Sequence, residues 1–287
     1  MSVDVTVSIV NWNTREELRA CLTTLLAQDG SVSTEVIVVD NASSDGSAEM
    51  LRSEFGNSIQ VIANDANRGF GAAHNQSIAI SSGRFVLLLN PDCRIPEPDA
   101  LGKMTRYMDA NPDVGMLGPK VLNPDGSLQY SARRFPRMLA GAFRHTVLGR
   151  LFPRNRFVRE YMMIDWAHDQ VRDVDWLSGS ALMVRREAFE QIGLLDESFF
   201  MYVEDVDWCR RAHQAGWRVV YYPMAIVEHR IGAASDQNPV EMIRQHHRSM
   251  LRYFLKYDGR GLKALLTPLV VLALWFRQRS LIRRVKC

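Results

Sequence analysis

The stretch Glu35-Val-Ile-Val-Val-Asp40 (EVIVVD) is apolar at every position between its two acids. Such a strand, rich in β-branched residues and apolar on both faces, is typical of a sheet that helices cover on both sides. Val5–Val10 upstream is a β-branched run, Phe85–Leu89 downstream is a further apolar strand, and Ile59–Ala63 is another predicted strand. The sequence therefore predicts four strands within its first ninety or so residues.

Residues with helical spacing separate these strands. Apolar positions recur every three or four residues behind a Thr14-x-x-Glu17 capping box, and helices are also predicted near 47–55 and 72–80. This β-α-β-α-β-α-β alternation predicts an α/β fold with an open, mostly parallel sheet and helices on both faces. Ligands of such sheets bind beyond the carboxyl ends of the strands.

The pattern is looser after Asp92. We expect strands at 115–122, 174–184, 217–222 and 226–229, an extended segment at 199–203, and helices at 100–110, 186–192 and 205–214. The predicted organisation is a catalytic domain at 1–230, with a nucleotide-binding half at 1–95 and an acceptor half at 96–230. A helical, basic extension follows at 231–287.

The charge of the chain is segregated. The 35 Lys and Arg exceed the 32 Asp and Glu by only three. Residues 133–159 nevertheless carry eight Arg and no acid, and residues 259–287 carry seven basic residues and no acid. The rest of the chain therefore sums to 3 − 15 = −12. An acidic body with two basic segments predicts an anionic partner, although a solvated basic face would also account for 133–159.

The compartment expected is the cytoplasm. The four cysteines are isolated in sequence, and the first strand lacks the features of a signal peptide. The apolar run Ala264–Phe276 is 13 residues long, shorter than the ~20 that a spanning helix needs. Because basic residues follow it, we interpret it as an in-plane membrane helix on the inner face of the cytoplasmic membrane; a buried C-terminal helix is the alternative.

Polar residues with useful chemistry stand where strands end. Asn11, Asp40 and Asp92 each follow an apolar strand, and Asn67–Asn75 (NRGFGAAHN) is a glycine-containing loop at a helix start. A carboxylate in such a place can bind a ribose, a base or a divalent cation shared with a diphosphate. Each feature also has a structural explanation, as a turn or a helix cap.

Two further clusters lie in the second half of the chain. Glu204-Asp205 opens a helix, where acids are commonly stabilising, but the preceding apolar-aromatic run would hold a carboxylate in the rigid, partly dry setting that suits a general base. His229 ends a short strand and could ligate a metal or be structural. Together these groups predict a nucleotide-diphosphate and metal site facing a base.

The chain resembles glycosyltransferases of family 2, with the GT-A fold, and is most similar to their rhamnosyltransferase-like bacterial members. The resemblance spans about 5–232. It is carried by seven ordered matches: VSIVNWN at 7–13, VVDNASSDGS at 38–47, NRGFGAAHN at 67–75, LLLNPD at 87–92, GPKVLNPDGSLQYSARRFP at 118–136, WLSGSALMVRREAFEQIGLLDESFFMYVEDVDWCRRAHQAGW at 176–217, and VEH at 227–229.

The resemblance implies roles for individual residues. Asp205 would be the catalytic base, supported by Glu204. Asp92 is the surviving acid of the family's DxD metal motif, whose first position is Asn90 here, and His229 would be a second ligand of Mg²⁺ or Mn²⁺. The donor would be bound by Asn11, Asp40, Asn41, Arg68, Gly69 and Asp92, and the sugar and acceptor pocket would be lined by Trp176 and Gly179.

The function implied is an inverting, metal-dependent transfer of a sugar from a nucleotide-sugar donor. The resemblance favours L-rhamnose from dTDP-rhamnose, moved to a saccharide or a polyprenyl-diphosphate-linked acceptor in cell-surface polysaccharide biosynthesis. One base without a covalent nucleophile implies a single displacement with inversion. A UDP-sugar donor, or a non-catalytic nucleotide-sugar-binding protein, is the alternative.

Two other classes of protein are disfavoured by the sequence. A nucleotidyltransferase would carry a glycine-rich basic loop after its first strand, where this chain has VNWNTREE. A nucleic-acid binder is suggested by the aromatic residues within 133–159, namely Phe135, Phe143, Phe152 and Phe157. The acidic remainder would repel a long polyanion, so we expect no nucleic acid and prefer an anionic membrane surface bound through 259–287.

Overall fold

The computed structural model describes residues 3–136, 149, 151–152 and 154–286. The N-terminal part alternates strands and helices as the apolar pattern predicts. The strands of this part pair in parallel, with β1 between β2 and β4 and with β3 beyond β2. Its elements are β1 (Val5–Asn11), α1 (Arg15–Leu26), β2 (Thr34–Asp40), α2 (Ser47–Phe55), β3 (Gln60–Ala63), α3 (Phe70–Ile80) and β4 (Phe85–Leu89).

The second half extends the same sheet, whose order is β3-β2-β1-β4-β10-β6-β11-β5, with β8 beside β11. β10 runs antiparallel to β4 and β6, so the sheet is mixed. The elements are β5 (Cys93–Arg94), α4 (Ala100–Ala110), β6 (Val114–Leu122), β7 (Ala132–Arg133), α7 (Arg156–Met162), β8 (Arg172–Asp173), β9 (Trp176–Leu177), β10 (Ala181–Arg185), α8 (Arg186–Ile192), α9 (Glu204–Gln214), β11 (Arg218–His229), α10 (Pro239–Tyr257) and α11 (Thr267–Lys286), with 3-10 turns η1 (Ser235–Gln237) and η2 (Gly261–Leu266).

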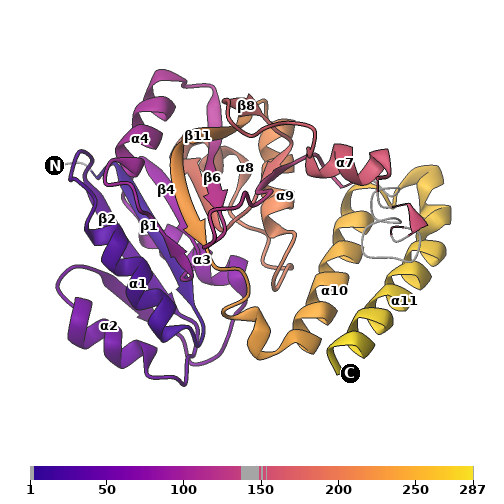
Figure 1. The fold of residues 1–287 in the computed structure, drawn as a ribbon, viewed down its shortest axis with the longest axis horizontal. Coiled ribbons are helices and arrows are strands. Elements are labelled where there is room, and N and C mark those ends of the chain that lie inside the picture. Colours follow the sequence, from indigo (N-terminus) through magenta and orange to yellow (C-terminus); the bar gives the residue numbers. More distant parts are fainter. Residues whose placement is uncertain (1–2, 137–148, 150, 153, 287) are drawn as a thin grey trace.

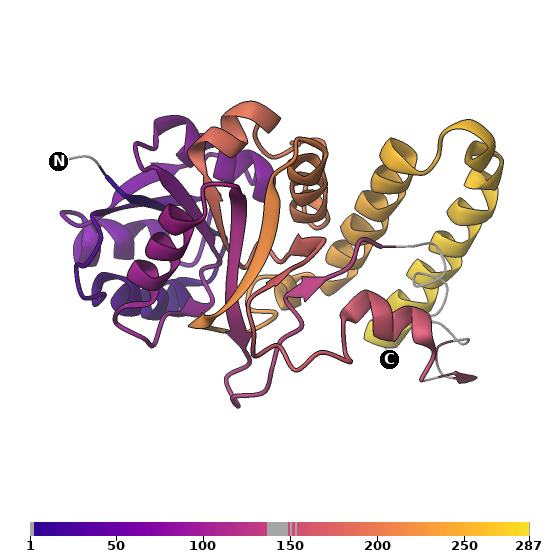
Figure 2. The same cartoon turned by 90° about the horizontal axis from the view of Figure 1, so that it is seen from above.

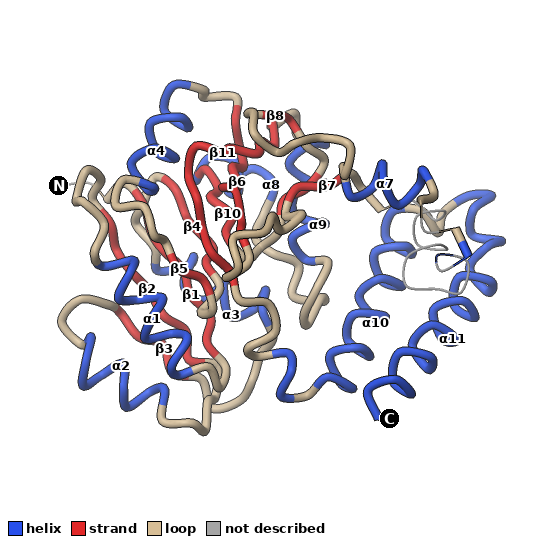
Figure 3. Tube along the Cα trace, in the orientation of Figure 1, coloured by secondary structure: helices blue, strands red, loops and turns tan. Residues whose placement is uncertain are grey.

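Helices cover both faces of the sheet (Figures 1 and 3). Successive side chains of a strand point to opposite faces, so Leu87 packs in the cluster that contains α1, α2 and α4. Leu88 packs in the cluster that contains α3, α8 and α9. The apolar strands of the sequence are thus buried on both sides, as their composition predicts.

Four local predictions were wrong. The two strands expected at 217–222 and 226–229 are one strand, β11, whose register shifts between Tyr222 and Ile226. Thr14 forms no capping bond; its hydroxyl donates to Asn11 Oδ1 at 2.7 Å, because the buried amide offers a partner that the helix end does not. The expected strand at 174–184 is two strands, β9 and β10, separated by a turn at 178–180. The segment 199–203 is not extended, since Tyr202 and Val203 have φ of +69° and +74°.

Helices α10 and α11 pack on each other and stand to one side of the sheet (Figures 1 and 2). The C-terminal end of α10 is tied to α9 through Asp207, which is fully buried. Lys256 Nζ lies 2.6 Å from Asp207 Oδ1, Tyr257 donates to the same oxygen at 2.7 Å, and Arg211 Nε donates to Oδ2 at 2.9 Å. Asp207, the third acid of the sequence EDVD, therefore connects α9 to the C-terminal end of α10.

Lys256→Met is expected to lower the free energy of unfolding by about 2 kcal/mol, because a buried carboxylate loses one of its neutralising partners while Arg211 remains. Urea denaturation measures this. Lys263→Met is the matched control, since Lys263 is largely exposed and lies 3.6 Å from Asp258; its effect should stay within about 0.5 kcal/mol. Equal losses in the two variants would show that Lys256 does not stabilise Asp207.

Candidate active site

The ends of β1 and β2 bring Asn11 and Asp40 together. The two residues are register partners, and both are buried. Asn11 Nδ2 donates to Asp40 Oδ1 at 3.0 Å, and the backbone N–H of Ser43 donates to Asp40 Oδ2 at 3.2 Å. The carboxylate is therefore held rigidly at the carboxyl edge of the sheet.

Asn41 attaches the glycine-containing loop to this edge. Its Oδ1 accepts the backbone N–H of Arg68 at 3.0 Å, and its Nδ2 donates to Asn67 at 2.9 Å. Gly69 has φ of +88°, and a Cβ at this position would lie 2.4 Å from the carbonyl oxygen of Phe200, so a larger residue would not fit. The Arg68 guanidinium, by contrast, is largely exposed and lies 3.8 Å from Asp65.

Asp92 and His229 meet because β5 pairs with β11, which sets Cys93 opposite His229. His229 Nε2 lies 3.1 Å from Asp92 Oδ1, and the candidate ligand atoms of Asp92, Cys93 and His229 all lie within 4.8 Å of one another. The Cys93 thiol donates to the Ser180 carbonyl at 3.3 Å, and burial raises its pKa well above the usual value. A protonated thiol is a poor ligand for a hard cation, so the useful pair is Asp92 and His229.

The residues around this pair fit a divalent cation. Gln129 Oε1 lies 3.0 Å from His229 Nδ1; if it accepts the Nδ1 proton, Nε2 keeps its lone pair. Asp92 Oδ1 is buried and has no hydrogen-bond partner within the described residues. With its lone pair available, His229 Nε2 can accept a hydrogen bond from Asn90 Nδ2 at 3.2 Å or bind a cation together with Asp92 Oδ1. Ligand atoms about 2.1 Å from one octahedral ion are about 3 Å apart, as this pair is.

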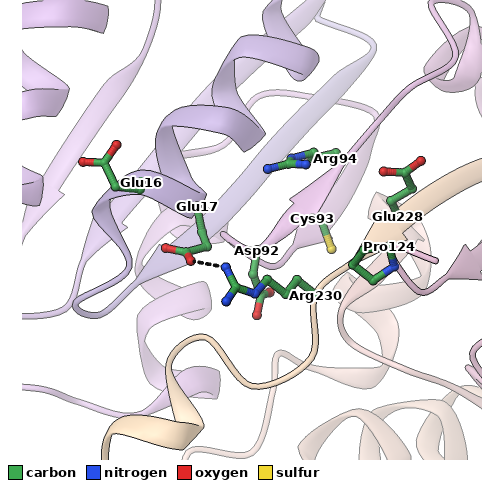
Figure 4. Close-up of a pocket in the computed structure, with 8 residues that line it drawn as sticks. All are labelled: Glu16, Glu17, Asp92, Cys93, Arg94, Pro124, Glu228 and Arg230. Atoms are coloured by element: carbon green, nitrogen blue, oxygen red, sulfur yellow. Dashed lines mark hydrogen bonds and ion pairs between the residues drawn. The ribbon is translucent and has the colours of Figure 1, made fainter.

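A cavity of about 300 Å³ opens beside Asp92 (Figure 4). Two arginines that were not predicted from the sequence line this cavity. They are Arg94, next to Cys93, and Arg230, whose guanidinium lies 3.0 Å from Glu17. The position of Arg230 directly after His229 was the available signal. The remaining lining residues are Glu16, Cys93, Pro124 and Glu228.

Glu204 and Asp205 begin α9. Asp205 Oδ2 accepts the backbone N–H of Gly179 at 3.0 Å, and its Oδ1 accepts that of Val206 at 2.8 Å. Burial raises the pKa of Asp205 despite these bonds. Burial, and then the charge of Asp205, raises the pKa of Glu204 well above its usual value, and Glu204 Oε2 has no partner among the described residues. Burial and mutual repulsion thus disfavour two negative charges on this pair, whose pKa values are both raised.

The turn at 178–180 connects the two clusters. Gly179 donates to Asp205 as above, while the Ser180 carbonyl accepts the backbone N–H of Asn90 at 2.9 Å as well as the Cys93 thiol. A Cβ on Gly179 would lie 3.5 Å from Asp205 Cβ and 3.4 Å from the Phe70 ring. The candidate base and the candidate metal pair thus attach to one short turn.

Trp176 lies behind this turn. Its ring is buried, its Nε1 donates to the Arg134 carbonyl at 2.8 Å, and the Arg133 guanidinium lies 5.0 Å from the ring centroid. Trp176 is not among the residues that line the cavity in Figure 4. Of the basic segment 133–159, Arg137, Arg144 and Arg150, together with Phe143, lie outside the described residues.

Comparison with known proteins shows the family of the chain. The family model described as "Glycosyltransferase like family 2" matches residues 3–251. The N-acetylglucosaminyl-diphospho-decaprenol L-rhamnosyltransferase of Mycobacterium tuberculosis is 36% identical over 225 residues, which cover 75% of this chain and 72% of that protein. The rhamnosyltransferase WbbL of Escherichia coli is 28% identical over 200 residues, covering 65% and 71% of the two chains.

Solved structures share the fold. A mannosyltransferase of Pyrobaculum calidifontis, in complex with GDP-Man and Mn²⁺, superposes with a TM-score of 0.60 at 17% identity, covering 100% of this chain and 76% of that one. Residues 1–349 of TarS from S. aureus, in complex with UDP, superpose with a TM-score of 0.57 at 17% identity, covering 97% and 72%. The sheet described above is therefore that of a GT-A fold.

Proposed function

Because the chain belongs to glycosyltransferase family 2, whose members transfer sugars, we propose that it is an inverting, divalent-cation-dependent glycosyltransferase that moves L-rhamnose from dTDP-rhamnose to a polyprenyl-diphosphate-linked saccharide. The donor and acceptor are suggested by the mycobacterial relative, whose name states a diphospho-decaprenol acceptor and L-rhamnosyl transfer. One observation supports the catalytic roles: the turn at 178–180 makes hydrogen bonds both to the Asp205 carboxylate, from Gly179, and to Asn90, two residues before Asp92.

The donor nucleoside is proposed to bind at the edge formed by Asn11, Asp40 and Asn41, with the backbone of Arg68 and Gly69 beside it. The rigid, buried Asp40 carboxylate supports this, because it can accept hydrogen bonds from ribose or base without rearrangement. Residues 1–95 would thus be the nucleotide-binding half of the domain 1–230, and 96–230 the acceptor half.

Asp92 and His229 are proposed to hold Mg²⁺ or Mn²⁺. When bound, such an ion neutralises the charge that develops on the departing diphosphate. Asn90 stands where the family has a second acid, and its Nδ2 lies 3.2 Å from His229 Nε2. We propose that Arg94 and Arg230, which line the same cavity, supply positive charge for the diphosphate as well.

Asp205 is proposed to take the proton of the acceptor hydroxyl as that oxygen attacks the anomeric carbon. An alcohol is a poor nucleophile until a base removes its proton, and a single attack from the face opposite the leaving group inverts the configuration. Glu204, with its strongly raised pKa, would stay protonated and keep a second negative charge away from Asp205. Gly179 would leave room for the sugar, and Trp176 would support the turn from behind.

The enzyme is proposed to act in the cytoplasm, at the inner face of the cytoplasmic membrane, in cell-surface polysaccharide biosynthesis. A polyprenyl-linked acceptor is confined to a membrane, so its transferase must reach that surface. The extension 231–287, and its basic end at 259–287 in particular, is the proposed contact with anionic lipid.

A panel of sugar nucleotides tests the proposed function. Purified protein is incubated with dTDP-rhamnose and with UDP-sugars, each with and without Mn²⁺, and with a polyprenyl-diphosphate-linked N-acetylglucosamine as the acceptor. Metal-dependent rhamnosyl transfer with inverted configuration is expected. Turnover with a UDP-sugar alone would contradict the donor assignment, and donor binding without any turnover would indicate a non-catalytic nucleotide-sugar-binding protein.

Gln129 is expected to orient the metal ligand. Its Oε1 contacts His229 Nδ1, and its Nε2 donates to the His229 carbonyl at 2.6 Å and to Asn123 Oδ1 at 2.8 Å. Gln129→Leu should weaken Mn²⁺ binding about 10- to 100-fold, the usual effect of losing such a partner. Titration calorimetry measures this directly, with the exposed Gln170→Leu as the control. Unchanged Mn²⁺ affinity would refute the orienting role.

A further inference from the structure

A continuous apolar stripe runs along the outer side of the C-terminal helix. It consists of side chains three or four positions apart, which share one face of a helix. Their exposed fractions range from 88% to 51%, far above those of buried core residues. Leu262 and Leu265 belong to the 3-10 turn η2, which leads directly into α11. We call the whole set the α11 stripe: Leu262, Leu265, Leu269, Leu272 and Phe276.

The opposite side of the helix is the one that packs on the protein. Val270, Leu274 and Leu281 are half-buried, whereas the residues of the stripe are exposed, and they repeat at helical spacing. Arg277, on the same side, donates to the Met250 sulfur of α10 at 3.5 Å. In Figures 1 and 2, α11 is the outer helix of the hairpin, with α10 between it and the sheet. The stripe therefore faces away from the catalytic body.

Positive charge continues the stripe beyond its last aromatic residue. Arg279 and Arg283 occupy the next positions at the same three- and four-residue spacing after Phe276. The Arg279 guanidinium lies 4.2 Å from the Trp275 ring centroid, on a ring that is itself 42% exposed. Because residues 259–287 contain no acid, nothing within this segment neutralises these cations.

We propose that the α11 stripe docks in the plane of an anionic phospholipid bilayer, with Phe276 and the leucines in the acyl boundary and Arg279 and Arg283 at the headgroups. The two arginines lie on the same face beyond the end of the stripe, and their long side chains can extend to the headgroups while the apolar residues enter the acyl boundary, as in interfacial helices. Charge complementarity selects the occupant, because anionic headgroups attract juxtamembrane cations. A second copy of this chain, if it used the same face, would instead bring two segments that contain no acid against each other.

The helix lies in the surface and does not cross it. By length and composition Gly261–Val285 would suffice to span a membrane, and none of its most apolar window is buried in the protein. The apolar run 264–276, which contains Thr267 and Pro268, however, covers only about 20 Å of helix against about 30 Å of hydrocarbon. Arg244 and Arg248 of the adjacent α10 have exposed side chains, which a crossing hairpin would draw toward the hydrocarbon.

Co-sedimentation of the full chain with vesicles tests the docking. Vesicles of phosphatidylcholine are compared with vesicles that also contain phosphatidylglycerol. Leu269→Gln/Leu272→Gln should weaken partitioning about tenfold for each leucine. Arg279→Gln/Arg283→Gln should weaken it about 30-fold on the anionic vesicles only. Ile80→Gln is the matched control, because Ile80 is 52% exposed on α3 of the catalytic body.

Each outcome decides the proposal. Loss in the leucine variant together with release of the wild-type protein by alkaline carbonate supports in-plane docking, whereas retention after carbonate overturns it in favour of a spanning helix. Partitioning that the leucine variant retains also overturns it. So does wild-type self-association that the leucine variant lacks, since the stripe would then bind a second copy. The proposal rests on the proposed function only for the idea of a lipid-linked acceptor, and vesicle binding needs no turnover, so either can fail alone.

Discussion

Asp205→Asn is expected to lower kcat by about 10²- to 10⁴-fold, the range that a positioned general base contributes. The asparagine keeps one of the two oxygens, which can still accept the Gly179 N–H while the bond from the Val206 N–H is lost, so the turn and the donor site should remain in place. The Kd of the sugar nucleotide, measured by calorimetry with Mn²⁺, should therefore stay nearly unchanged. Retention of most of the turnover would mean that Asp205 is not the base.

The pH profile of the same enzyme provides a second readout. Burial raises the pKa of Asp205, so its carboxyl takes up a proton, and loses its basicity, at a higher pH than an ordinary aspartic acid does. Wild-type kcat should thus decline on acidification above about pH 4, and this acid limb should be absent from the residual rate of Asp205→Asn. The exposed Asp169→Asn serves as a control and should keep both the rate and the limb.

Asp92→Ala is expected to weaken the metal-assisted binding of the donor by more than about 100-fold, because losses of outer-sphere partners alone cost 10- to 100-fold. The variant removes one of the two proposed metal ligands, Asp92 Oδ1 and His229 Nε2, which lie 3.1 Å apart, and leaves only His229. Calorimetric titration of Mn²⁺, and of donor with and without Mn²⁺, measures the effect independently of turnover.

Glu228→Gln is the control for Asp92→Ala, since Glu228 lines the same cavity but is not in the candidate ligand group. It removes the same negative charge from the cavity while leaving Asp92 and His229 in place. A similar loss in both variants would indicate that overall charge, and not ligation, is responsible. Unchanged metal dependence in Asp92→Ala would contradict the metal role of the residue.

The N-terminal half of the fold could be predicted because its signals are local. An apolar strand such as Glu35–Asp40 indicates burial on both faces of the sheet. A helix between two strands indicates a crossover connection, which pairs the strands in parallel. The meeting of Asn11 and Asp40 follows from that, since both end adjacent parallel strands. The capping box failed although its competitor is local: the Thr14 hydroxyl donates to Asn11, three residues earlier, and the Asn11 side chain is held in place by Asp40 of the neighbouring strand.

The second half was harder because its signals are non-local. The predicted strand at 174–184 is interrupted at Gly179, whose backbone N–H is used by Asp205 from another element. Cys93, Gln129 and Arg94 acquire their places beside His229 only through the pairing of β5 with β11 and the bonds of Gln129. Nothing in their spacing along the chain indicates a shared site.

The sequence by itself determined the α/β class, the family and the identity of the groups capable of chemistry, because apolar periodicity and ordered motifs are properties of short segments. The tertiary structure decided which of these groups meet. It joined Asp92 to His229 across paired strands, separated Asp207 from Asp205 by burying it against Lys256, and turned Trp176 inward. It also left Leu269, Leu272 and Phe276 of α11 exposed, whereas the sequence allowed either a membrane-facing or a buried helix. The physical reason is that burial and pairing depend on every element that packs nearby, and a segment of sequence carries information only about itself.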